Sequence, residues 1–132
     1  MWAAVHRLLR ASGTAWLVLG DVRTESGSIS GTPWRVVFAL QREGWLLRNA
    51  LIASTAAGCH QVGFLLVKQP RYFFNIEAIQ AEYGKNPGDV VLDGDSLVAR
   101  CITAGCPSGG ILLDPFNDTD MAAVIGRAGT AA

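Results

Sequence analysis

The sequence predicts an α/β fold in which helices cover both faces of one sheet. Helical and strand-like apolar patterns alternate along the chain, which is typical of an α/β architecture. The strand-like runs are apolar throughout, as expected for strands that are buried on both faces. A chain of 132 residues has the length of one domain, so we expect residues 1–132 to form a single domain.

The first half of the chain predicts two helices, a strand between them and an exposed loop. Apolar residues recur at helical spacing over residues 2–9, and residues 13–21 form a continuous apolar run of strand length. Residues 23–31 are rich in Ser and Gly, which indicates a loop. A second helix is expected from Pro33 to Gly44, with Thr32 as its N-cap. Its apolar face comprises Trp34, Val37, Phe38 and Leu40.

The second half alternates in the same way. Strands are predicted over residues 45–52, 62–67, 90–92 and 111–113. Helices are predicted over residues 76–83, 96–104 and 121–127. Turns are expected at residues 54–58, 86–89 and 107–110. The aromatic residues 72–74 can continue the strand 62–67 beyond Pro70, and the strand 111–113 is expected to lie beside the strand 13–19.

Composition excludes several classes of protein. Eleven Lys and Arg residues balance eleven Asp and Glu residues, which argues against a stand-alone nucleic-acid binder. The apolar runs are far shorter than the roughly 20 residues that span a bilayer, and none resembles a signal peptide, so we expect a cytoplasmic protein with no membrane partner. Three cysteines and two histidines without metal-ligand spacing predict buried free thiols, with neither a disulfide framework nor a metal site.

A resemblance to a known family appears in a set of collinear blocks. The blocks are residues 13–21 (GTAWLVLGD), 31–41 (GTPWRVVFALQ), 44–48, 60–61, 64–68, 71–74, 78–79, 97–102 and 109–116 (GGILLDPF). Together they resemble the bacterial and phage site-specific DNA methyltransferases that modify the exocyclic amino group of adenine or cytosine. The order of the blocks and the Pro-Trp-Arg and Asp-Pro-Phe signatures make this resemblance specific.

The resemblance implies a Rossmann-like S-adenosylmethionine-dependent methyltransferase sheet, here incomplete, with DNA as partner and S-adenosylmethionine as cofactor. In such sheets ligands bind beyond the carboxyl ends of the strands. The implied cofactor-binding residues are therefore Asp114, Pro115, Phe116 and Asp21. Asp114 can instead be a helix N-cap, and Asp21 can simply end its strand in solvent.

The departures from the family pattern predict a shortened and altered member that is inactive alone. The catalytic Asp/Ser-Pro-Pro-Tyr or Phe segment precedes the matching region in the family, and nothing like it occurs upstream of Gly13, so no catalytic residue is assigned. The family's glycine-rich Gly-Ser-Gly-Thr turn is replaced by residues 117–121, in which Asp118 and Asp120 are acidic. Adenine-packing aromatics are replaced by Val90, Asp93 and Gly94.

The target-reading loops of the family are shortened here to residues 54–58 and 82–89. His60 is expected to make a structural hydrogen bond, and Arg35 either touches a phosphate or lies on the helix surface. The carboxylates at positions 93, 95, 118 and 120 do not have the spacing of a calcium loop. Two other functions stay open: a non-catalytic interaction module, and one part of a split enzyme that pairs with a complementing methyltransferase fragment.

Overall fold

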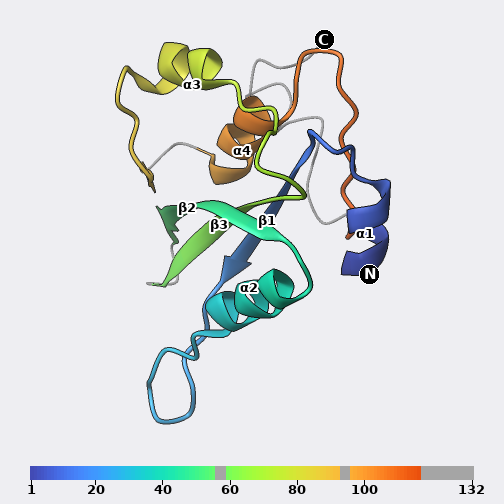
Figure 1. The fold of residues 1–132 in the computed structure, drawn as a ribbon. Coiled ribbons are helices and arrows are strands. Elements are labelled where there is room, and N and C mark those ends of the chain that lie inside the picture. The colour runs from blue at the N-terminus through green and yellow to red at the C-terminus, as the bar shows by residue number, and fades with distance from the viewer. Residues whose placement is uncertain (56–58, 93–95, 117–132) are drawn as a thin grey trace.

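The computed structural model describes residues 1–55, 59–92 and 96–116. Four strands form one sheet in the order β1-β3-β2-β4 (Figure 1). The strands are β1 (Thr14–Gly20), β2 (Leu46–Ser54), β3 (His60–Val67) and β4 (Val90–Val91). β3 runs antiparallel to both of its neighbours, and β4 pairs with β2 in parallel. It follows that β1, β2 and β4 all point the same way.

In the described residues, four helices lie against this sheet, and both of its faces are covered as the sequence predicts (Figure 1). They are α1 (Trp2–Leu8), α2 (Thr32–Arg42), α3 (Ile76–Tyr83) and α4 (Leu97–Gly105). α2 lies on one face, and α4 lies on the other with α3 beside it. The predicted α/β class is therefore confirmed, although the sheet is mixed rather than parallel. None of the helices in the described residues is long and apolar enough to cross a membrane.

β3 is the centre of the core, because its residues from Val62 to Val67 are all buried. On one face, Phe64 and Leu66 pack in one cluster with Val37 and Leu40 of α2. On the other face, Gly63 leaves room for α4, since a Cβ at that position would lie 3.3 Å from the side chain of Leu97. Both faces of the central strand are thus closed by helices.

The apolar face of α2 differs from the predicted one. Val37 and Leu40 are buried as expected, and Trp34 packs edge-on against Phe64 with 4.9 Å between ring centroids, although it is still 37% exposed. Phe38 is 48% exposed. Pro33 is buried at the helix start, and the N-cap is Gly31 rather than Thr32. Gly31 has φ 72°, a left-handed conformation that glycine adopts without strain.

Two predicted strand segments lie outside the sheet, and one prediction about β1 is wrong. Ile111 is 98% exposed and Leu113 is 65% exposed, so the segment 111–113 does not lie beside β1. The turn that precedes it, closed by Gly110 N donating to Pro107 O at 2.8 Å, sends the chain away from the sheet. The aromatics at 72–74 do not extend β3, because Phe73 N instead donates to Ser12 O. The predicted helix 121–127 lies outside the described residues.

β1 is a terminal strand of the sheet in the part of the chain that the structure describes. Only Leu17 in it is fully buried, so β1 is not buried on both faces as predicted. Its residues still divide between the two faces: Leu17 belongs to the core on the α2 side, whereas Trp16 and Val18 pack against the core on the α4 side.

Candidate functional site

The carboxyl ends of β1, β2 and β4 meet at one edge of the sheet, where a ligand site is expected. Gly20 pairs with Gln61 and Ser54 pairs with His60, which places the start of β3 at this same edge. Thr55 closes the β2–β3 connection, because its backbone N–H and its hydroxyl both donate to Cys59 O. His60 is half-buried within β3, at the position where a structural hydrogen bond was expected.

Asp21 follows β1 at this edge and holds the loop that leads into α2. Its carboxylate accepts the Ser30 hydroxyl at 2.5 Å, the Gly31 N–H at 3.0 Å and the Val22 N–H at 2.8 Å. These hydrogen bonds, with the Ser30 hydroxyl first, hold the pKa of the Asp21 carboxyl below its ordinary value. The carboxylate therefore stays ionised at neutral pH. The carboxylate anchors both ends of the loop 22–31. A ligand at this edge would therefore have to share the Asp21 carboxylate with the loop.

The second group of predicted cofactor residues lies at the end of the described chain. Asp114 is half-buried and accepts a hydrogen bond from Phe116 N at 3.2 Å, a local turn contact typical of Asp. Pro115 is exposed and Phe116 is 59% exposed. The segment that carries these residues lies well apart from the carboxyl end of β1 (Figure 1).

The described residues thus do not bring Asp21 and Asp114 into one site. Nor do the described residues at 114–116 enclose a space for S-adenosylmethionine, since two of the three side chains face solvent. The residues of the altered turn, 117–121, and the replaced positions 93 and 94 lie outside the described residues. The assignment of Asp114, Pro115, Phe116 and Asp21 to a cofactor stays a prediction.

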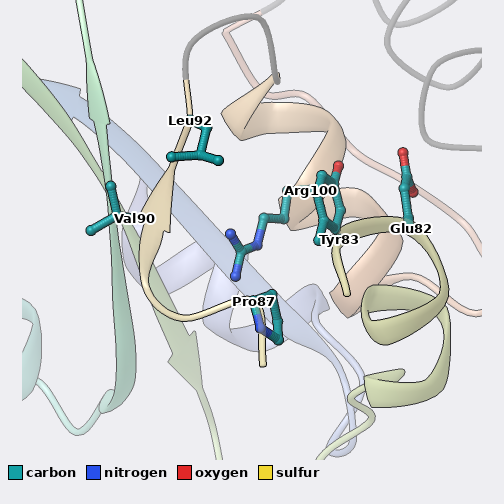
Figure 2. A pocket seen from close by; sticks show the side chains of 6 residues that line it. All are labelled: Glu82, Tyr83, Pro87, Val90, Leu92 and Arg100. Carbon is teal, nitrogen blue, oxygen red and sulfur yellow. The ribbon is translucent and has the colours of Figure 1, made fainter. Parts of the chain in front are cut away.

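A hollow of about 250 Å³ lies between α3, α4 and β4 (Figure 2). Its walls are formed by Glu82, Tyr83, Pro87, Val90, Leu92 and Arg100. Arg100 is only 5% exposed, and its guanidinium donates to Gly88 O and lies 5.2 Å from the centre of the Tyr83 ring. A buried cation with an aromatic face and a carbonyl beside it is a stable arrangement. Its effect is to tie the segment after α3 to α4.

Sequence reasoning did not single out Arg100. The signal was present, because Arg100 carries the one charge in the mostly apolar helix Leu97–Gly105. A lone charge among residues that must be buried requires a specific partner. That partner, Gly88 O, lies twelve residues earlier and could not be read from the sequence.

The three cysteines are free thiols, and the predicted burial holds for Cys101 alone. Cys101 is buried, and burial raises its pKa, so this thiol is not ionised at neutral pH. Cys59 and Cys106 are half-buried. Among the described residues, no group of three or more potential ligands could hold a metal ion.

Comparison with known proteins shows a relationship that the geometry alone does not. The chain is 27% identical to Type II methyltransferase M.SmaI of Serratia marcescens over 92% of its length. It is 22% identical to M.Cfr9I of Citrobacter freundii over 95% of its length, and 30% identical to M.SfiI of Streptomyces fimbriatus over 60%. This chain is related to the Type II DNA methyltransferases. No family model matches this methyltransferase relative.

The match covers only part of the related enzymes. The chain spans 61% of the length of M.SmaI, 60% of M.Cfr9I and 25% of M.SfiI. The alignment with M.SmaI extends over 179 positions, more than the 132 residues of this methyltransferase relative. M.SmaI therefore has additional residues inside the matched stretch. The shortening of the loops at 54–58 and 82–89 stays a prediction.

Proposed function

We propose that this chain acts in methyl transfer to DNA as one part of a methyltransferase, with residues 1–132 forming a single methyltransferase-like domain. By resemblance, the complete enzyme would transfer a methyl group from S-adenosylmethionine to the exocyclic amino group of adenine or cytosine. The observation that carries the proposal is the open edge of β1. In the described part of the chain, this apolar strand has a partner on one side only.

An open apolar edge is unusual in a protein that functions alone. Edge strands are commonly protected by charged residues, proline or bulges, and β1 (TAWLVLG) contains no charge and no proline. The apolar residues Ile111, Leu112 and Leu113 are also exposed. A strand contributed by a complementing methyltransferase fragment would satisfy the free backbone groups of β1 and offer apolar surface to the segment 111–113.

The chain by itself is expected not to methylate DNA. Its 132 residues contain no Pro-Pro pair, so none of them forms the Pro-Pro-Tyr or Pro-Pro-Phe segment that positions the flipped base in the family. The assay is transfer of labelled methyl from S-adenosylmethionine to mixed-sequence DNA. Transfer above background by the chain alone that disappears in Asp114→Ala would overturn this expectation.

Complementation is tested with the part of M.SmaI that lies outside the matched stretch. We expect the β1 amides to exchange hydrogen more slowly when this piece is present, and methyl transfer to occur only in the mixture. Exchange at the amides of β3, which already pair on both sides, is the internal control. Unchanged β1 exchange together with absent transfer would contradict the complementation proposal.

The altered turn provides a separate test of the cofactor. The double change Asp118→Gly and Asp120→Gly removes two negative charges where the carboxylate of S-adenosylmethionine would lie, and restores the backbone freedom of glycine. Relief of about 1.4 kcal/mol would tighten binding about tenfold, as measured by calorimetry. Glu77→Gln with Glu82→Gln removes the same charge on α3 and serves as the control. Equal affinities in the two variants would exclude the turn as the cause of weak binding.

A further inference from the structure

The charges of this chain are segregated, although they sum to zero. Residues 1–72 contain eight Lys and Arg against three Asp and Glu, whereas residues 73–132 contain three against eight. Overall neutrality argued against nucleic-acid binding, but an asymmetric distribution favours it. The question is whether the fold gathers the basic residues on one surface.

The sheet register brings several of them to the edge opposite the carboxyl ends of β1 and β2. Val67, the last residue of β3, pairs with both Thr14 and Leu46. The chain entering β1, the start of β2 and the chain leaving β3 therefore meet at this edge. Four cations lie on these three segments: Arg10, Arg48, Lys68 and Arg71. We call this set the basic edge.

Direct contacts hold the segments of the basic edge together. The Lys68 ammonium donates to Leu9 O at 2.9 Å, which fixes it beside the end of α1. The Arg48 guanidinium lies 5.6 Å from the centre of the Tyr72 ring, which joins β2 to the turn that follows β3. Arg10, Arg48 and Arg71 are exposed, whereas Lys68 is half-buried with its ammonium bound to Leu9 O.

Few acidic residues lie near the basic edge, because residues 1–72 contain only three Asp and Glu. Asp21 and Glu25 follow the carboxyl end of β1, at the far edge of the sheet. Two carboxylates do lie near the basic edge: Glu43 is in the turn that leads into β2, and Asp89 accepts a hydrogen bond from the side chain of Asn49 at 3.3 Å. Four cations outnumber these two carboxylates. The basic edge therefore presents a net positive surface that fits a chain of phosphates.

We propose that the basic edge binds the phosphate backbone of duplex DNA without reading its sequence. The choice of DNA over another polyanion rests on the proposed function, whereas the surface itself rests on the geometry above. Because this edge is opposite the one where a methyl-transfer site is expected, it would contact DNA independently of cofactor and target base. Exposed cations supply affinity that falls with salt, at a slope of about 0.9 in log K per phosphate neutralised.

The test measures binding of a fluorescent mixed-sequence duplex by anisotropy from low to physiological salt. For the natural chain we expect a slope of log K against log salt of about −3.6, which is four cations at about 0.9 each. The triple variant Arg10→Gln, Arg48→Gln, Arg71→Gln leaves one cation, so it should reduce the slope to about −0.9 and weaken binding at least tenfold at low salt. The single variant Arg71→Gln, in an exposed turn, should reduce the slope by about 0.9.

A charge-matched control separates this surface from general charge. Arg23→Gln with Lys85→Gln removes two exposed cations from other segments, so we expect an unchanged slope, whereas Arg10→Gln with Arg71→Gln should reduce the slope by about 1.8. Equal losses in these two double variants, or no salt-dependent binding by the natural chain, would overturn the proposal. So would binding to phosphatidylserine vesicles but not to duplex DNA. Methyl transfer is measured in a separate assay. A negative result for DNA binding by the basic edge therefore does not contradict the proposed function.

Discussion

Gly105 should be intolerant of a side chain, because it lets the end of α4 approach β1 closely. A Cβ at Gly105 would lie 2.5 Å from Trp16 Nε1 and nearer still to the Thr14 hydroxyl, both on the rigid strand. Thr14 Oγ1 also donates to Gly105 O at 3.1 Å. Overpacking costs about 1–3 kcal/mol and loss of the hydrogen bond about 1 kcal/mol, while alanine returns up to about 1 kcal/mol in helix propensity. We therefore expect Gly105→Ala to lose about 2 kcal/mol of unfolding free energy.

Urea unfolding followed by tryptophan fluorescence measures this loss. With a slope of about 2 kcal/mol per molar urea for a chain of this size, the midpoint should fall by about 1 M. Gly20→Ala is the matched control, because its Cβ would meet nothing closer than the flexible Gln61 side chain at 3.9 Å. That variant should unfold within about 1 kcal/mol of the natural chain. Equal midpoints for Gly105→Ala and Gly20→Ala would refute the close approach of α4 to β1.

Two further predictions concern the anchored segments at either side of the sheet. Arg100→Met removes a charge-assisted hydrogen bond of about 1.5–3 kcal/mol, so trypsin should cleave after Lys85 at least about tenfold faster, while cleavage after Arg23, in a separate loop, stays unchanged. An unaltered rate at Lys85 would contradict the anchoring role. Because the folded-state pKa of Asp21 is lowered from its ordinary value of 3.8, its contribution is complete above that pH and is lost as pH falls through the folded-state pKa. The difference in thermal midpoint between the natural chain and Asp21→Ala should therefore be constant from pH 7 to about pH 5 and shrink below about pH 4. The corresponding difference for Ser30→Ala should depend less on pH. A difference that grows on acidification would contradict this stabilising role of the Asp21 carboxylate.

Elements with a strong local pattern could be predicted from the sequence. The helix Ile76–Tyr83 has the predicted bounds, and its N-cap is Asn75, which accepts a hydrogen bond from Ala78 N. The helix Leu97–Gly105 begins after Ser96, a conventional N-cap residue that accepts from Ala99 N. β3 is the most buried strand, as its apolar run indicates. In these cases the local signal and the tertiary environment agree.

Features that depend on distant neighbours could not be predicted in the same way. Phe38 fits the apolar face of α2 by spacing, yet it is exposed, because Val37 and Leu40 fill the space above the sheet and Trp34 lies between Phe38 and the core, with its ring against Phe64. For the candidate site, the sequence located Asp21 at the end of β1 but not its bonds to Ser30 and Gly31. Those bonds come from a loop that closes back on the strand, which apolar periodicity does not describe.

The errors at β1 and at residues 111–113 have a common physical cause. A continuous apolar run is typical of a strand that lies inside a sheet, with other strands and helices packed around it. Both runs have this composition. In the described chain β1 pairs only with β3, and residues 111–113 pair with no strand. In the described chain both segments therefore expose apolar surface, and both have backbone groups that pair with no strand. One additional strand placed along β1 would reduce the exposed apolar surface and the unpaired backbone groups together, which is why the complementation experiment tests the fold and the proposed function at the same time.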